Sequence, residues 1–174
     1  MNKDEVTFNC YQWRAENEEK EAQCCLASLY YEGKGTEKNL EISFYWYQTS
    51  AEKDCYFAQY NLAILYERGE GTTKNLEMAF HWYRKAAESG YEPAQTNLGC
   101  LYEQGLGTEK DLEAALYWYQ RAADNGYSSA QHNLAVLYRK TDLERALYCY
   151  QKQRKVAIPQ HNIILLPYIV KGTK

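Results

Sequence analysis

Residues 58–93 read AQYNLAILYERGEGTTKNLEMAFHWYRKAAESGYEP, and close copies of this stretch flank it on both sides. The copy before it is AQCCLASLYYEGKGTEKNLEISFYWYQTSAEKDCYF, the copy after it is AQTNLGCLYEQGLGTEKDLEAALYWYQRAADNGYSS, and a shorter copy follows. The copies begin at Ala22, Ala58, Ala94 and Ala130, which gives a period of 36 residues. A fixed period of this length is typical of repeat proteins, whose units bury their apolar faces against one another.

Each copy predicts two helices joined by a glycine turn. In the first helix, Ala58, Leu62 and Leu65 have the spacing of one helix face. Gly69 and Gly71 then end this helix, because glycine tolerates the left-handed conformation that helix termini use. Good N-capping residues precede the second helices at Asn39, Asn75, Asp111 and Asp142. No segment alternates with a period of two, so no strand is predicted.

One such helix pair has too little core to fold alone, so the pairs are expected to stack. We therefore predict an all-α fold, an α-α superhelix in which antiparallel helix pairs form a solenoid. The alanines that open each copy allow close approach of helices, while larger side chains fill the spaces between them. Trp46, Trp82 and Trp118 recur in register on the second helices and are expected to pack rather than to contact a ligand.

The predicted units differ at the two ends of the chain. We expect a partial repeat with only its second helix at 1–21, full repeats at 22–57, 58–93 and 94–129, a shortened repeat at 130–158, and a degenerate fifth-repeat start or tail at 159–174. Terminal repeats are usually atypical, which favours degenerate caps or a truncated array. The alternative is that apolar Ile163–Val170 docks on a partner or on another copy of the chain.

The pattern A-x-x-x-L-x-x-L-Y-x-x-G-x-G-T-x-K-[ND]-L-x-x-A-x-x-W-Y-x-x-A-A-x-x-G resembles the Sel-1-like repeat, a relative of the tetratricopeptide repeat. The resemblance is strong over 22–129 and weak over the remainder. It implies a non-catalytic scaffold, because such arrays act as adaptors in protein quality control, signalling and the regulation of cell-wall synthesis. The tyrosine-rich style is similar to fungal members that carry a protein-kinase domain, so a fragment of a larger kinase-associated protein is an alternative.

Composition and charge argue against several classes of function. No run of about 18 apolar residues exists, so no membrane span is predicted, and the N-terminus lacks the apolar core of a secretory signal. Residues 1–137 carry 12 Lys and Arg against 21 Asp and Glu, and such an acidic body disfavours binding of nucleic acid. Residues 138–174 carry 8 against 2. We expect a cytoplasmic protein without a nucleic-acid partner.

Motifs for catalysis or cofactor binding are missing from the sequence. GEGTTK is not a phosphate-binding loop, because it follows a helix and recurs as GKGTEK and GLGTEK in register. His81, His132 and His161 occupy different faces and repeats, and the six cysteines form no CxxC pair that would indicate zinc. We predict neither an enzyme nor a cofactor.

A cysteine-rich branch of the family, linked to penicillin binding, supplies the alternative from another class, a hydrolase. By resemblance, that branch places cysteines at the end of the second helix and the start of the next helix. In this chain those places hold Ala51, Ala87 and Ala123, and Gln59, Gln95 and Gln131. The departure favours buried or inert thiols in a reducing cytosol.

Differences between the copies supply the candidate partner-binding residues. The third, seventh and tenth places of the first helices vary, and spacings of four and three put them on one face. In related solenoids this face is concave, and asparagines on it can hold a peptide backbone. We predict a groove for a peptide or protein, lined by Tyr31, Tyr60, Asn61, Ile64, Glu67, Thr96, Asn97, Cys100, Glu103, His132, Asn133 and Arg139. The alternative is that these residues are merely solvated and that the asparagines bond the neighbouring helix.

Overall fold

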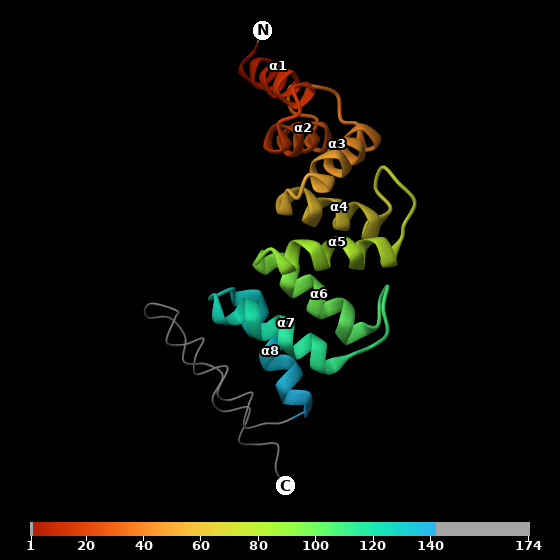
Figure 1. The fold of residues 1–174 in the computed structure, drawn as a ribbon, viewed down its shortest axis with the longest axis vertical. Helices are drawn as coiled ribbons and strands as arrows, with labels where there is room; N and C mark the ends of the chain where they lie inside the picture. The colour runs from red at the N-terminus through yellow and green to blue at the C-terminus, as the bar shows by residue number, and fades with distance from the viewer. Residues whose placement is uncertain (1, 142–174) are drawn as a thin grey trace.

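The computed structural model describes residues 2–141, and this range is built of helices and turns (Figure 1). The predicted cap Asp142 and the apolar segment Ile163–Val170 lie outside the described residues. The helices in chain order are α1 (Lys3–Glu16), α2 (Lys20–Glu32), α3 (Leu40–Glu52), α4 (Tyr56–Arg68), α5 (Leu76–Glu88), α6 (Glu92–Gln104), α7 (Leu112–Asp124) and α8 (Ser128–Thr141).

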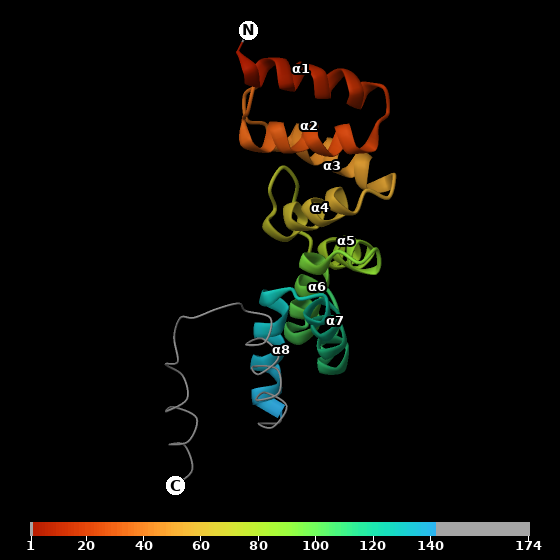
Figure 2. The same cartoon turned by 90° about the vertical axis from the view of Figure 1, so that its left-hand side faces the viewer.

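The helices stack in chain order into an elongated array (Figures 1 and 2). Contacts are most extensive within the pairs α2–α3, α4–α5 and α6–α7, and each pair packs on the next through α3–α4, α5–α6 and α7–α8. Helix α1 packs on α2, and the first helices α6 and α8 also touch. The predicted all-α superhelix of stacked helix pairs is confirmed. Within the described residues, no helix is both long enough and apolar enough to cross a membrane.

The predicted helix boundaries have the expected physical causes. The side chains of Asn39 and Asn75 each accept a hydrogen bond from a backbone N–H in the first turn of α3 or α5. Asp111 caps α7 in the same way. The first helices α2, α4 and α6 end at glycines with left-handed backbone, which are Gly33, Gly69 and Gly105.

The second glycine of each turn is required for packing between repeats. Gly107 has a φ of +68° and lies directly against the carbonyl of Leu76, at the start of the preceding second helix. Gly71 lies in the same way against Leu40. A Cβ atom at either position would overlap this backbone, so each turn packs on the repeat before it only because it carries glycine.

Alanine and glutamine form the buried contacts where successive repeats meet. The alanines that open the copies have no exposed surface: Ala22, Ala58, Ala94 and Ala130. The glutamine after each alanine is also buried, and Gln59 Nε2 donates to the carbonyl oxygen of Ala51 at 3.2 Å. Equivalent bonds recur at the other boundaries. The alanine at the end of each second helix and the glutamine at the start of the next helix are thus neighbours, joined by a hydrogen bond.

The tryptophans of the second helices pack as predicted. Trp82 and Trp118 are buried, with 7% and 9% of their surface exposed. Trp46 is half-buried and packs on the same core. The buried residues form successive clusters along the array, and Trp46 packs against two of them.

Candidate functional site

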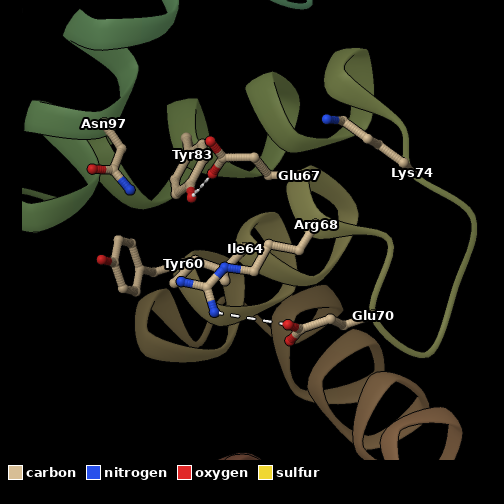
Figure 3. Close-up of a pocket in the computed structure, with 8 residues that line it drawn as sticks. All are labelled: Tyr60, Ile64, Glu67, Arg68, Glu70, Lys74, Tyr83 and Asn97. Atoms are coloured by element: carbon tan, nitrogen blue, oxygen red, sulfur yellow. Dashed lines mark hydrogen bonds and ion pairs between the residues drawn. The ribbon is translucent and has the colours of Figure 1, made fainter.

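A depression of about 570 Å³ opens between repeats 2 and 3, on the face formed by the first helices (Figure 3). We call it the open junction. Its lining residues are Tyr60, Ile64, Glu67, Arg68, Glu70, Lys74, Tyr83 and Asn97. Four of the twelve predicted residues are therefore brought together here: Tyr60, Ile64 and Glu67 from α4, and Asn97 from α6.

A buried tyrosine holds the carboxylate of the open junction. The hydroxyl of Tyr83 donates to Glu67 Oε2 at 2.6 Å, and its ring has no exposed surface (Figure 3). Burial, and then the bond to Glu67, raises the pKa of Tyr83, so the phenol stays neutral and remains a donor. The side chain of Asn97 lies within hydrogen-bonding reach of the hydroxyls of Tyr83 and Tyr60. The wall of the depression is thus a fixed polar network.

An aromatic patch extends the open junction toward the start of α4. It consists of Tyr56, Phe57, Tyr60 and Tyr91, whose neighbouring ring centroids lie 4.6–5.4 Å apart. Tyr56 and Phe57 are exposed at 41% and 47% of their surface. Tyr60 joins the patch to the depression, because its ring also lies 5.7 Å from that of Tyr83.

The other end of the open junction carries charge of both signs. Arg68 lies 3.8 Å from the carboxylate of Glu70 (Figure 3). The same carboxylate accepts a hydrogen bond of 2.9 Å from the hydroxyl of Tyr31. The predicted residue Tyr31 therefore borders the depression from repeat 1. Lys74 lies on the turn before α5. The open junction thus offers aromatic surface at one end and hydrogen-bonding charged groups at the other.

Equivalent residues of repeats 3 and 4 are joined to one another by hydrogen bonds and an ion pair. We call this region the sealed junction. The hydroxyl of Tyr119 lies 3.1 Å from both Cys100 Sγ and Glu103 Oε2. Lys140 Nζ donates to Glu103 Oε1 at 2.6 Å, and Asn133 Nδ2 donates to Cys100 Sγ at 3.6 Å. The candidates Cys100, Glu103 and Asn133 are therefore engaged within the scaffold.

The remaining candidates lie apart from the depression. The side chain of Asn61 donates to the carbonyl of Phe57 in its own helix. Thr96 is only 5% exposed and its hydroxyl donates to the carbonyl of Glu92, so its side chain is not available to contact a partner. The last two candidates are exposed on α8, at His132 and Arg139. Asn133 bonds to the neighbouring first helix, which is the arrangement of the alternative interpretation, whereas Asn61 bonds within its own helix. Asn97 lines the depression and also lies within hydrogen-bonding reach of Tyr60 and Tyr83 on the neighbouring helices.

Four residues of the depression were not among the sequence candidates: Arg68, Glu70, Lys74 and Tyr83. A signal for Arg68 was present, because the eleventh place differs in every copy. It holds Glu32, Arg68, Gln104 and Lys140. The sequence pointed away from Tyr83, because a tyrosine recurs at this place in every full copy and a recurring residue is expected to belong to the core.

The described residues hold no cluster of His, Cys, Asp and Glu side chains suited to a metal ion. Among them, Cys10, Cys24, Cys25, Cys55 and Cys100 are free thiols. In this part of the chain, the features of the first-helix surface are therefore its hydrogen bonds, aromatic contacts and ion pairs.

Comparisons with known proteins agree with this architecture. The family model of the Sel1 repeat matches residues 20–55, 57–91, 92–127 and 128–152. A Sel1 repeat protein from Oxalobacter formigenes has 35% identity and a TM-score of 0.82, over 89% of this chain and 66% of that one. A protective antigen of uropathogenic Escherichia coli, described as displaying an SLR fold, has 26% identity and a TM-score of 0.83, over 87% and 34%.

An immunity protein from Pseudomonas aeruginosa has 26% identity and a TM-score of 0.58, over 90% of this chain and 61% of that one. The chain thus spans less than two thirds of the length of these three proteins. A comparison with curated protein sequences gave no match. Sel1 repeats generally mediate protein interactions, and their scaffolds are generally non-catalytic. Since the matched repeats cover most of its length, this chain belongs to the Sel1 repeat family.

Proposed function

We propose that this chain is a non-catalytic adaptor that holds a peptide or protein segment at the open junction. The observation that carries the proposal is the depression itself, which joins aromatic surface to charged and amide groups across two repeats. Binding sites for peptides combine an apolar anchor with a few convergent polar groups. The open junction has both, on helices that pack into a rigid array.

Each part of the open junction would have its own role in binding. Tyr60 and Ile64 would pack against an apolar side chain of the partner, and tyrosine is enriched at protein interfaces because it offers large area at low entropic cost. Asn97 offers a donor and an acceptor for the backbone of an extended segment. Arg68 and Lys74 are exposed cations at the far end, and pairing there would favour a carboxylate of the partner.

The same scaffold explains why binding is assigned to one junction. At the sealed junction Glu103 already accepts from Lys140, and Thr96 stands buried where Tyr60 stands in the open junction. The solved relatives are described as an immunity protein and as a protective antigen, and those descriptions differ. The proposal therefore rests on the open junction and not on either relative.

Peptide display against the full chain tests the proposal. A selected peptide is titrated against the chain, against Tyr60→Ala and Asn97→Ala, and against Tyr117→Ala as a matched control. Tyr117 is an exposed tyrosine on the second helix α7, away from the depression. We expect Tyr60→Ala to weaken binding by about 2 kcal/mol, roughly 30-fold, and Tyr117→Ala to leave it unchanged. Unchanged binding by a folded Tyr60→Ala and Asn97→Ala, checked by circular dichroism, would discard the open junction.

A further inference from the structure

The aromatic patch beside the depression is a preformed ring surface that remains open to solvent. The ring of Tyr91 contacts the other three rings, with its centroid 5.0–5.4 Å from those of Tyr56, Phe57 and Tyr60. The four rings therefore hold one another in place, while Tyr56 and Phe57 stay exposed. A surface that is already ordered binds a partner's side chain at a low cost in conformational entropy.

Elsewhere in this chain, aromatic rings carry a lysine or an arginine over them. The described residues include four such pairs, with the cation 5.2–5.7 Å from the ring centroid: Lys38 over Tyr31, Lys85 over Trp82, Arg121 over Trp118 and Arg14 over Tyr11. The face of an aromatic ring is the negative part of its quadrupole, and it attracts the cation. Within residues 2–141, no cation of the chain lies over a ring of the aromatic patch. That place is left for a cation of the partner.

Two carboxylates flank the aromatic patch. Asp54 lies in the turn before α4, and Glu92 follows Tyr91 at the start of α6. Burial raises the pKa of Tyr91, and the nearby carboxylate of Glu92 adds to that shift. Among the ion pairs of the described residues, none involves Asp54 or Glu92, and Lys53, the cation next to Asp54 in sequence, is bound to Glu18. The charges around the rings thus favour a basic group of the partner.

The charge of the whole body acts in the same direction. Residues 1–137 carry 12 Lys and Arg against 21 Asp and Glu. The sealed junction, in contrast, keeps only one ring of the aromatic patch, at Tyr127. Its other three places hold Glu92, Pro93 and Thr96. The combination of several rings and unpaired carboxylates therefore belongs to the open junction.

We propose that the aromatic patch binds an arginine or lysine side chain of the segment held at the open junction. The inference rests on the proposed function and adds the chemistry of the partner. Tyr56 precedes Ile64 by eight residues on α4. Eight residues of helix span about 12 Å, and about four residues of extended chain cover that distance. The partner therefore carries its cation about four residues from the apolar side chain that packs on Ile64.

Display selection of peptides against the full chain, followed by exchange of single side chains, tests this inference. We expect the selected peptides to share an arginine or lysine about four residues from an apolar residue. Replacing that arginine by citrulline, or that lysine by norleucine, removes the charge at nearly constant size. We expect this exchange to weaken binding about 5-fold.

Leucine variants of the patch separate attraction of a cation from apolar contact. Tyr56→Leu and Phe57→Leu keep apolar surface but remove a ring, so each should weaken the charged peptide and have little effect on the neutral one. Tyr117→Leu, which removes an exposed ring on α7, is the matched control and should change neither. Circular dichroism checks that each variant is folded.

The outcomes separate this inference from the proposed function. Peptides that need Tyr60 and Asn97 but share no cation would overturn the inference and leave the proposed function standing. Equal weakening of the charged and neutral peptides by Tyr56→Leu would do the same, because the patch would then offer apolar contact alone. A selection that yields no peptide, or only peptides that bind without Tyr60 and Asn97, would contradict the proposed function and the inference together.

Discussion

The open junction and the sealed junction have the same scaffold but different surfaces. In both, a fully or almost fully buried tyrosine of the second helix donates to a glutamate on the first helix, through Tyr83 to Glu67 and through Tyr119 to Glu103. In the open junction that glutamate borders a depression. In the sealed junction its equivalent accepts Lys140, which comes from the next first helix.

A few surface positions distinguish the two junctions, and under the proposed function these positions determine which junction accepts a partner. The helix pairing and the buried tyrosine are common to both junctions, so they belong to the scaffold. The residues that change alter bulk and charge on the surface. They are Tyr60 to Thr96, Ile64 to Cys100, Arg68 to Gln104, Glu70 to Leu106 and, on the next first helix, Gln104 to Lys140. A solenoid can in this way keep its packing while one boundary specialises.

Replacing Gly107, the glycine through which repeat 3 packs on repeat 2, should have the largest effect on stability. Gly107→Ala places a Cβ atom against the Leu76 carbonyl at a left-handed φ, so strain and overlap add. We expect a loss of about 3 kcal/mol in the free energy of unfolding, measured with urea. Gly126→Ala, in the turn before α8, also has a positive φ but meets nothing within 4 Å. This control should lose only about 1 kcal/mol; equal losses would contradict the packing role of Gly107.

Removing a buried tyrosine hydroxyl should have the second-largest effect on stability, and the effect should differ between the two junctions. Tyr83→Phe leaves the half-buried carboxylate of Glu67 without the hydroxyl that donates to it, and we expect a loss of about 1.5 kcal/mol. Tyr119→Phe should cost less, because Glu103 keeps its bond to Lys140. Urea unfolding of both variants gives the comparison. If Tyr119→Phe lost as much as Tyr83→Phe, Lys140 would not be supporting Glu103.

Alkaline pH should weaken the array through the same tyrosines. Burial first raises the pKa of Tyr83 and of Tyr119, so the folded chain holds these protons more tightly than the unfolded chain. Their contribution is therefore complete below the unfolded pKa, about 10, and falls as pH rises above it. We expect each of the two tyrosines to contribute a decline of about 1 kcal/mol per pH unit above pH 10, so about 2 kcal/mol per pH unit in all, measured by urea unfolding. Tyr83→Phe should show a shallower decline; an unchanged slope would count against this tyrosine.

Removing the ion pair between Lys140 and Glu103 at the sealed junction should have the smallest effect on stability. Lys140→Met removes the ion pair with Glu103, but the lysine side chain is 60% exposed and solvent screens the interaction. We expect a change of no more than about 0.5 kcal/mol in thermal or urea unfolding. A loss above about 2 kcal/mol, which is typical of a buried pair whose partner is left behind, would show that Lys140 does more than cover Glu103.

The sequence predicted the scaffold better than the surface, for a physical reason. Helix pairs, caps such as Asn75 and end glycines such as Gly69 depend on local spacing, which the copies repeat. The need for glycine at Gly71 comes from the Leu40 carbonyl, a contact between repeats that spacing does not reveal. Tyr83 shows the same limit, because its ring is core while its hydroxyl reaches the surface carboxylate of Glu67.

Within the predicted surface, variation between copies selected a helix face that borders the depression, but it did not separate the residues that line the depression from those bonded within the scaffold. Thr96 varies between copies and is nevertheless buried, with its hydroxyl donating to the carbonyl of Glu92. Arg68 borders the depression, although only the third, seventh and tenth places were chosen as candidates. A buried tyrosine needs a hydroxyl partner, and applying that rule to Tyr83 and Tyr119 would have identified the engaged glutamates.

Site-specific photo-crosslinking tests the central claim, that the open junction binds and the sealed junction does not. A photoreactive side chain is placed at Arg68 or, separately, at Gln104, which occupy the same place in repeats 2 and 3 and are both exposed; Lys140 is kept, so the sealed junction stays intact. The selected peptide is then added and irradiated. We predict a cross-link from position 68 and none from position 104. Cross-linking at position 104 alone, or equally at both positions, would contradict the account.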